Sequence, residues 1–98
     1  MYFVLICTDK PGHLQVRMDT RPTHVEYLNG LNEKGILKLA GPFTGDDDKP
    51  NGSLVIVEAA SAEEAMSIAA ADPYAQAGLF AEVSVRPWNW VFNAPGAE

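Results

Sequence analysis

The chain opens with an unbroken run of apolar and aromatic side chains, from Tyr2 to Cys7. Successive side chains of a strand point to opposite faces of its sheet, so this segment presents apolar groups on both faces. We therefore predict a central strand that is covered on both sides. A chain of 98 residues forms one core, and we expect a single domain over residues 1–98 with an aromatic C-terminal tail at residues 88–98.

A first helix is predicted over residues 21–34, where Leu28 and Leu31 belong to an apolar row at helical spacing. Pro22 is placed in its first turn, because the N–H that proline lacks has no helical partner at that position. Gly35 follows as the expected C-terminal stop.

Three more strands and a second helix complete the predicted pattern. Ser61 is a helix N-cap, and the alanine-rich helix that it begins should end before Pro73, since the residue preceding a proline avoids helical conformation. The dipeptide Asn51-Gly52 favours a hairpin turn between the second and third strands. These strands are expected at residues 36–43, 54–57 and 78–87.

The order strand, helix, strand, strand, helix, strand predicts an α+β fold, a ferredoxin-like βαββαβ domain with a four-stranded antiparallel sheet in the order 4-1-3-2. Both helices then cover the same face. The opposite face still carries apolar side chains of the first and third strands, and soluble monomers rarely expose such a patch. We expect two sheets to pack face to face in a homodimer. The tail at residues 88–98 either clasps the second subunit or caps its own core.

The charge and the apolar runs limit the possible partners. A net charge of −6 with scattered Lys and Arg residues argues against nucleic acid. The sequence has no signal-peptide pattern and no run near the roughly 20 apolar residues of a membrane-spanning helix, so we expect no membrane partner and a cytoplasmic location. The lone Cys7 fits a reducing compartment, and its place in a core strand argues against a nucleophilic role.

No motif in the sequence predicts a metal or a cofactor. His13 has no second ligand at metal-binding spacing. The acidic run Asp46–Asp48 lacks the glutamate of an EF-hand loop, because Val57 stands at that position. Phosphate-binding glycine loops and haem-attachment motifs are not found. We expect no metal and no cofactor, and a small molecule as the ligand.

His24 and Asp72 are the predicted reactive pair. The start of the first helix and the end of the second lie at one end of the predicted sheet, and helical spacing turns both side chains inward. A helix N-terminus disfavours a protonated histidine and a helix C-terminus disfavours a carboxylate, so a hydrogen bond between them would relieve both. Such a bond leaves the second ring nitrogen as a general base near neutral pH. The alternative is a buried histidine bonded to the backbone and an aspartate that caps a turn.

Five residues are candidates for substrate binding, and Gly41 and Pro42 among them end the second strand at the same edge as His24 and Asp72. The five are Arg21, Gly41, Pro42, Tyr74 and Arg86. Arg21 is predicted to orient an anionic substrate beside His24, and in the alternative interpretation it is only solvated.

Several short motifs together resemble the YCII-related (YciI-like) family. They cover the chain from Met1 to about Trp90 and are Arg21-Pro22-Thr23-His24, Leu39-Ala40-Gly41-Pro42, Ser61-Ala62-Glu63-Glu64-Ala65, Asp72-Pro73-Tyr74, Ala77-Gly78-Leu79 and Arg86-Pro87-Trp88. The resemblance implies a dimeric α/β barrel of ferredoxin-like subunits. It also implies a pocket with a catalytic histidine and aspartate, which correspond to His24 and Asp72.

Two functions follow as hypotheses. The first is a cofactor-independent lyase, isomerase or dehydrochlorinase-like enzyme for a small acidic or aromatic metabolite, with His24 as general base and Asp72 as the residue that orients it. The second is a non-catalytic dimeric module that binds a small molecule or a protein. Proteins with the fold that the resemblance implies include both enzymes and binding modules, so the fold alone does not distinguish the two hypotheses.

Overall fold

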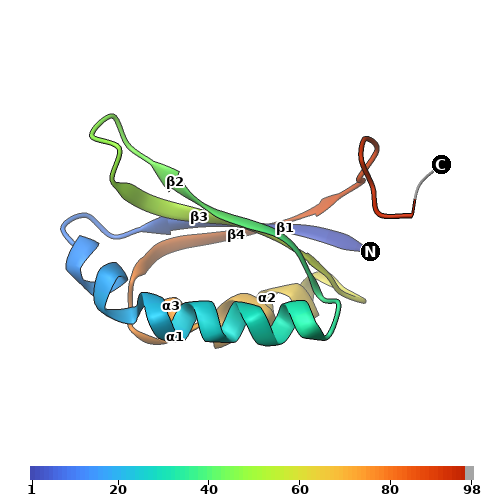
Figure 1. Ribbon diagram of the computed structural model, residues 1–98, viewed down its shortest axis with the longest axis horizontal. Helices are drawn as coiled ribbons and strands as arrows, with labels where there is room; N and C mark the ends of the chain where they lie inside the picture. Colours follow the sequence, from blue (N-terminus) through green and yellow to red (C-terminus); the bar gives the residue numbers. More distant parts are fainter. Residues whose placement is uncertain (97–98) are drawn as a thin grey trace.

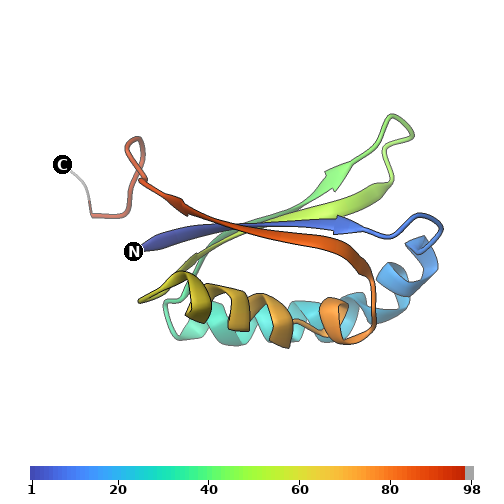
Figure 2. The same ribbon diagram turned by 180° about the vertical axis from the view of Figure 1, so that it is seen from behind.

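The computed structural model describes residues 1–96 and contains a four-stranded antiparallel sheet whose helices all lie on one face (Figures 1 and 2). The elements are β1 (Tyr2–Asp9), α1 (Leu14–Glu33), β2 (Leu37–Thr44), β3 (Pro50–Glu58), α2 (Ala62–Ala71), α3 (Pro73–Gln76) and β4 (Phe80–Trp88). The strand order β2-β3-β1-β4 confirms the predicted ferredoxin-like arrangement. No helix within residues 1–96 is long and apolar enough to cross a membrane.

The core lies between the sheet and the helices, and β1 is at its centre. Phe3, Leu5 and Cys7 alternate along β1 and are buried against the helical layer. Ala65 and Ala69 of α2 belong to the same cluster, and their short side chains let the helix approach the sheet closely. The residues of β1 that face the helices are therefore at the centre of the hydrophobic core.

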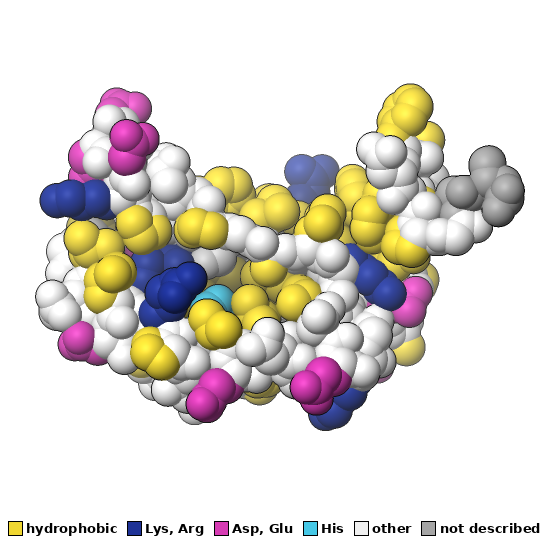
Figure 3. Space-filling model, viewed as in Figure 1, with side chains coloured by type: hydrophobic (Ala, Val, Ile, Leu, Met, Phe, Trp, Pro, Cys, Tyr) yellow, Lys and Arg dark blue, Asp and Glu magenta, His cyan; other side chains and the backbone are white. Residues whose placement is uncertain are grey.

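The other face of the sheet is apolar and has no helix over it. Tyr2, Val4 and Ile6 lie there, beside Leu54 and Ile56 of β3. In Figure 3 hydrophobic side chains follow this upper surface between the raised β2–β3 hairpin and the raised C-terminal segment. This face matches the prediction of an apolar surface that the chain does not cover by itself.

The first helix begins earlier than predicted. It starts at Leu14, seven residues before the predicted start at Arg21, and Pro22 lies inside it. An interior proline leaves the carbonyl four residues earlier without its helical hydrogen bond. The buried ion pair of Arg17 with Asp9 holds the first turns of the helix and offsets this loss. The predicted end is confirmed, because Gly35 has a φ of 75° and terminates the helix.

Two local predictions after the first helix need correction. Helix α2 ends before Pro73 as expected, but Pro73 then starts the short helix α3, since proline is well suited to a first helical position. The hairpin turn lies at residues 45–49 and not at Asn51-Gly52, and Asp48 supplies its left-handed residue with a φ of 61°. Gly52 instead lies within β3, where it pairs with Thr8.

The aromatic tail packs partly on its own chain. The Trp90 ring meets the Tyr2 ring edge-on at a centroid distance of 5.5 Å and lies 5.5 Å from the Trp88 ring. Beyond it Val91 and Phe92 are exposed, and the Phe92 side chain is 82% accessible. The tail thus caps one end of its own apolar face. The last two residues of the predicted tail, 97 and 98, lie outside the described residues.

Gly52 provides a test of the register of the sheet. A Cβ atom at this position would lie 2.6 Å from the Cys7 carbonyl oxygen, so Gly52→Ala must displace backbone. We expect it to lower the free energy of unfolding by about 1–3 kcal/mol in urea titrations. The matched control is Gly30→Ala in α1, where a Cβ meets nothing within 4 Å; it should stabilise the protein by about 0.5–1 kcal/mol. Equal effects of the two substitutions would contradict the described pairing of β1 with β3.

Candidate active site

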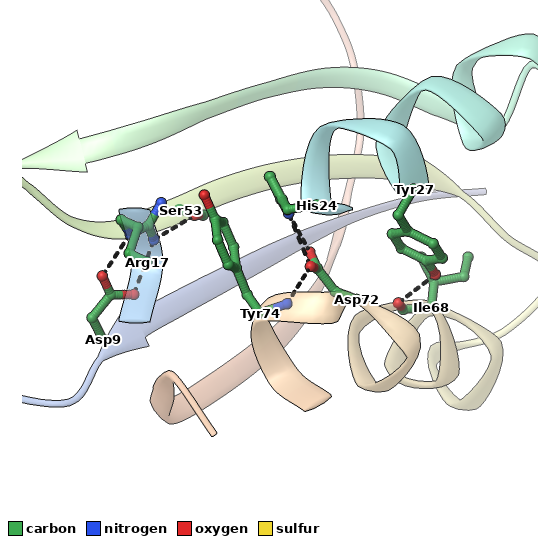
Figure 4. Close-up of polar contacts among 8 residues, drawn as sticks. All are labelled: Asp9, Arg17, His24, Tyr27, Ser53, Ile68, Asp72 and Tyr74. Carbon is green, nitrogen blue, oxygen red and sulfur yellow. Dashed lines mark hydrogen bonds and ion pairs between the residues drawn. The ribbon is translucent and has the colours of Figure 1, made fainter. Parts of the chain in front are cut away.

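His24 and Asp72 meet in the structure. His24 Nδ1 lies 2.9 Å and 3.0 Å from the two carboxylate oxygens of Asp72 (Figure 4). His24 is 9% exposed and Asp72 is 6% exposed, so water competes little for this bond. With the carboxylate ionised, Nδ1 donates its hydrogen to Asp72, and Nε2 is the ring nitrogen left to meet a ligand.

The predicted electrostatic basis of this pair is wrong for His24. His24 lies near the middle of the 20-residue α1, because the helix begins at Leu14, and so it is not at a helix N-terminus. Asp72 ends α2 but also caps α3, where its Oδ1 accepts a hydrogen bond of 2.9 Å from the Tyr74 N–H. Asp72 therefore holds the imidazole and caps a turn at the same time, which combines the two alternatives considered for it.

The Tyr74 ring supports the imidazole. The two rings are stacked with a centroid distance of 3.9 Å and an interplanar angle of 17°. The guanidinium carbon of Arg17 lies 4.6 Å from the Tyr74 centroid, and Figure 4 shows Arg17 and His24 on either side of that ring. Tyr74 is 1% exposed, and burial raises the pKa of its hydroxyl. The stack fixes the plane of the imidazole, which the bond to Asp72 alone does not.

Arg17 is a buried site residue that the sequence analysis missed. Its Nε donates to Asp9 Oδ2 at 2.7 Å, and its Nη2 donates to Asp9 Oδ1 and to Ser53 Oγ, both at 2.9 Å. Arg17 is 4% exposed. Burial on its own lowers the pKa of Arg17, but the hydrogen bond and the charge of Asp9 outweigh it and the pKa is raised. The guanidinium stays charged inside the protein.

A signal for Arg17 was present in the sequence. Arg17, His24 and Leu31 are spaced seven apart, and all three are buried on one face of α1. Two helical turns span about seven residues, so the spacing places them in one row. The predicted helix begins only at Arg21, because proline favours the first turn of a helix, and Arg17 therefore falls outside it.

A cavity of about 190 Å³ opens beside the stack. It is lined by Arg17, Arg21, His24, Val25, Leu28, Ala40, Gly41, Pro42, Ser53, Val55 and Tyr74. In Figure 3 a hollow brings a histidine and basic side chains together among hydrophobic ones. Four of the five predicted substrate-binding residues thus lie at one cavity with His24.

Arg86 is the predicted residue that the structure does not bring to this cavity. It lies on β4 opposite Val4, which places it on the apolar face away from the helices. A larger and more open hollow, of about 660 Å³, lies between the 8–14 loop and the 45–51 loop. None of the predicted site residues lines it, so size alone does not mark the reactive site.

Residues 1–96 contain no group of three His, Cys, Asp or Glu side chains that could hold a metal ion. His24 Nδ1 is engaged by Asp72, and Asp9 is engaged by Arg17. The Cys7 side chain of β1 is buried on the helical side of the sheet, where burial and the charge of Asp72 raise the pKa of its thiol to about 12. The cavity is lined by an imidazole, two guanidinium groups and the hydroxyl-bearing side chains of Ser53 and Tyr74.

The protein is therefore of the ferredoxin-like class, with helices on one face of its sheet. A buried histidine–aspartate pair lies at a small cavity within it. The chain belongs to the YCII-related domain family, which matches residues 1–89. It is 40% identical over 98 residues to the protein YciI of Escherichia coli O6:H1, covering 94% of this chain and 100% of that protein.

Two solved structures place the fold in context. One is a 5-chloro-2-hydroxyhydroquinone dehydrochlorinase from Burkholderia phenoliruptrix in complex with 2,5-dihydroxybenzoquinone, with a TM-score of 0.81, 39% identity, and coverage of 91% of this chain and 94% of that one. The other is an antibiotic biosynthesis monooxygenase, with a TM-score of 0.54, 14% identity, and coverage of 93% and 99%. The second likeness concerns the fold alone.

The burial of Cys7 makes a testable prediction. A thiol reacts with iodoacetamide as the thiolate, and a pKa raised from 9.0 to about 12 leaves almost none at pH 8. We expect the native protein to resist labelling at pH 8 and the urea-unfolded protein to be labelled fully, as measured by intact mass. Rapid labelling of the native protein would contradict the burial of Cys7.

Proposed function

We propose that this protein is a cofactor-independent, dehydrochlorinase-like enzyme that acts on a small acidic or aromatic metabolite. His24 is its general base and Asp72 orients His24. The observation that carries the proposal is the bond between His24 Nδ1 and Asp72 at the edge of a cavity, which leaves Nε2 for a substrate. The 39% identity to a dehydrochlorinase supports the reaction class.

The proposed step is an elimination that needs no oxidant. The ring first takes its keto form, in which the proton of the hydroxyl next to the chlorinated carbon has moved to that carbon and made it tetrahedral. His24 Nε2 then takes the proton of the hydroxyl para to the new carbonyl, the O–H electron pair forms a second C=O bond, and the ring π electrons shift toward the carbon that carries chlorine. The C–Cl bond breaks with both of its electrons, so chloride leaves and the products are H⁺, Cl⁻ and the dehydrochlorinated ring. Asp72 stabilises the imidazolium that forms, since its carboxylate faces the protonated Nδ1.

The walls of the cavity fit the remaining roles. Arg21 is the proposed partner of the substrate's negative charge, and Gly41 and Pro42 of β2 form one wall. Tyr74 supports the His24 ring and is also part of the cavity wall. Arg86 has no part in this proposal because it lies on the opposite face of the sheet.

His24→Asn tests the general base. The asparagine amide can still donate to Asp72 but cannot accept a proton, so the fold should be kept while catalysis is lost. With 5-chloro-2-hydroxyhydroquinone as the first substrate and chloride release as the readout, we expect kcat to fall about 100- to 10,000-fold. Asp72→Asn should also lower kcat, because it removes the charge that stabilises the imidazolium.

The control is Glu26→Gln, an exposed position on α1, which should leave kcat unchanged. Circular dichroism spectra establish that all variants are folded. Wild-type turnover retained by His24→Asn would remove His24 from the mechanism. If the wild type releases no chloride yet binds 2,5-dihydroxybenzoquinone, the binding-module hypothesis replaces the enzyme.

We also propose that the protein is a homodimer joined through the apolar faces of two sheets. Leu39 is 48% exposed on that face, opposite Ile56, so Leu39→Glu adds a charge there without disturbing the core. Light scattering coupled to size exclusion should find a dimer for the wild type and a shift toward monomer for Leu39→Glu. Met66→Glu, at an exposed apolar residue of α2 on the helical side, is the control and should stay dimeric. A wild type that is monomeric at all concentrations would contradict the proposal.

A further inference from the structure

Arg17 is held with part of its guanidinium group turned to the cavity. Its Nε and Nη2 make the three bonds to Asp9 and Ser53, and none of these uses Nη1. Every fully buried side-chain nitrogen or oxygen within residues 1–96 has a hydrogen-bond partner. Nη1 makes none of these three bonds, which indicates that it is not fully buried. Since Arg17 also lines the cavity, Nη1 is the nitrogen from which it can donate to a ligand there.

Arg21 brings a second cation to the same place. It lies four residues after Arg17 on α1, so both side chains extend from one face of the helix. Both line the cavity that contains His24, and both also line the adjoining hollow next to Met18 and Pro50. Asp9 is the ion-pair partner of Arg17, whereas Arg21 has no ion pair within residues 1–96. An acidic chain thus keeps two guanidinium groups together at its cavity, and only that of Arg17 is paired with a carboxylate.

The size and the walls of the cavity limit what can bind there. Its volume of about 190 Å³ is below the range of about 300–1,000 Å³ that is usual for drug-sized ligands. Val25, Leu28 and Val55 supply apolar walls. Space of this size between apolar walls, with cations at one end and an imidazole beside them, suits one small planar ring.

We propose that Arg17 and Arg21 form an anion-binding subsite that takes a single-ring organic anion through an ionised ring oxygen or a carboxylate. This inference rests on the proposed function, because it places the rest of the ring against His24. The clamp by Asp9 and Ser53 fixes the guanidinium of Arg17 in advance, so little side-chain entropy is lost on binding. Arg17 is then the fixed donor, and the more exposed Arg21 closes on the anion.

Binding measured by calorimetry tests the subsite without any turnover. The probes are 2,5-dihydroxybenzoquinone for an ionised ring oxygen, benzoate for a carboxylate, and benzamide as the neutral counterpart of benzoate. We expect at least one anion to bind, with an affinity that falls as salt rises and is about tenfold or more above that of benzamide. The probe that binds identifies the form of the anion.

The variants separate the two arginines from general charge effects. Arg21→Gln should weaken anion binding about tenfold or more, whereas Lys34→Gln, which removes the same charge roughly 20 Å away along α1, should change it less than twofold. Removing Arg17 alone leaves Asp9 buried without its partner, so the test uses the double variant Asp9→Leu with Arg17→Met, which deletes both charges and keeps similar volumes. We expect this folded double variant to lose anion binding.

The outcomes also distinguish this inference from the proposed function. His24→Asn should keep anion binding within about threefold while it loses turnover, so absence of turnover in the wild type leaves the subsite testable. Three results would overturn the subsite: no binding of either anion at millimolar concentrations, equal affinity for benzamide and benzoate, or unchanged binding in Arg21→Gln and the double variant.

Discussion

The carboxylate of Asp72 is the contact on which the arrangement of the site depends. It accepts hydrogen bonds from the His24 ring on α1 and from the Tyr74 backbone on α3, and it lies where α2 ends. Tyr27 adds a second tie, because its hydroxyl donates to the Ile68 carbonyl of α2 at 2.7 Å (Figure 4). Three helices are thereby fixed to one another above one face of the sheet, and the imidazole is fixed with them.

The position of Pro73 explains why this junction forms. Proline keeps Asp72 out of helical conformation, with a ψ of 131°, and so ends α2. Its ring also sets the first residue of α3, and Asp72 then becomes the N-cap of that helix. The same dipeptide therefore stops one helix, starts the next, and turns a carboxylate toward α1. A carboxylate that caps a helix already has one oxygen fixed, and this limits the rotation of the group toward His24.

The sequence was sufficient for the features that local chemistry decides. The unbroken apolar run Tyr2–Cys7 marked the central strand, and helical periodicity marked the inward position of His24, because both patterns can be seen in the local sequence. The start of α1 could not be predicted in the same way. Its first turns are held by the ion pair of Arg17 with Asp9, two residues that approach only after β1 and α1 have packed. The seven-residue spacing of Arg17 and His24 is compatible with a longer helix but does not reveal the bond to Asp9, and Pro22 pointed to a later start.

The stacking of Tyr74 was outside the reach of the sequence for a related reason. Helix α3 has four residues, too few for a periodic pattern, yet it carries the ring that touches both His24 and Arg17. A β-bulge near Asp9 contributes here: between Asp9–Phe80 and Thr8–Glu82 the β4 strand has one extra residue. That shift turns the Phe80 side chain toward Tyr74, and the two rings meet edge-on with a centroid distance of 6.1 Å.

A buried ion pair and a buried histidine–aspartate hydrogen bond in so small a domain are difficult to explain by stability alone. The desolvation of a buried pair often cancels its attraction, so apolar side chains of equal size would hold the fold as well. The Arg17–Asp9 and His24–Asp72 pairs lie on opposite sides of the Tyr74 ring, and Arg17 and His24 both reach the same cavity. In each pair the basic group lines the cavity and the carboxylate does not. The arrangement therefore directs hydrogen-bond donors and a ring nitrogen to one small volume, which is the geometry that the proposed roles in binding and proton transfer require.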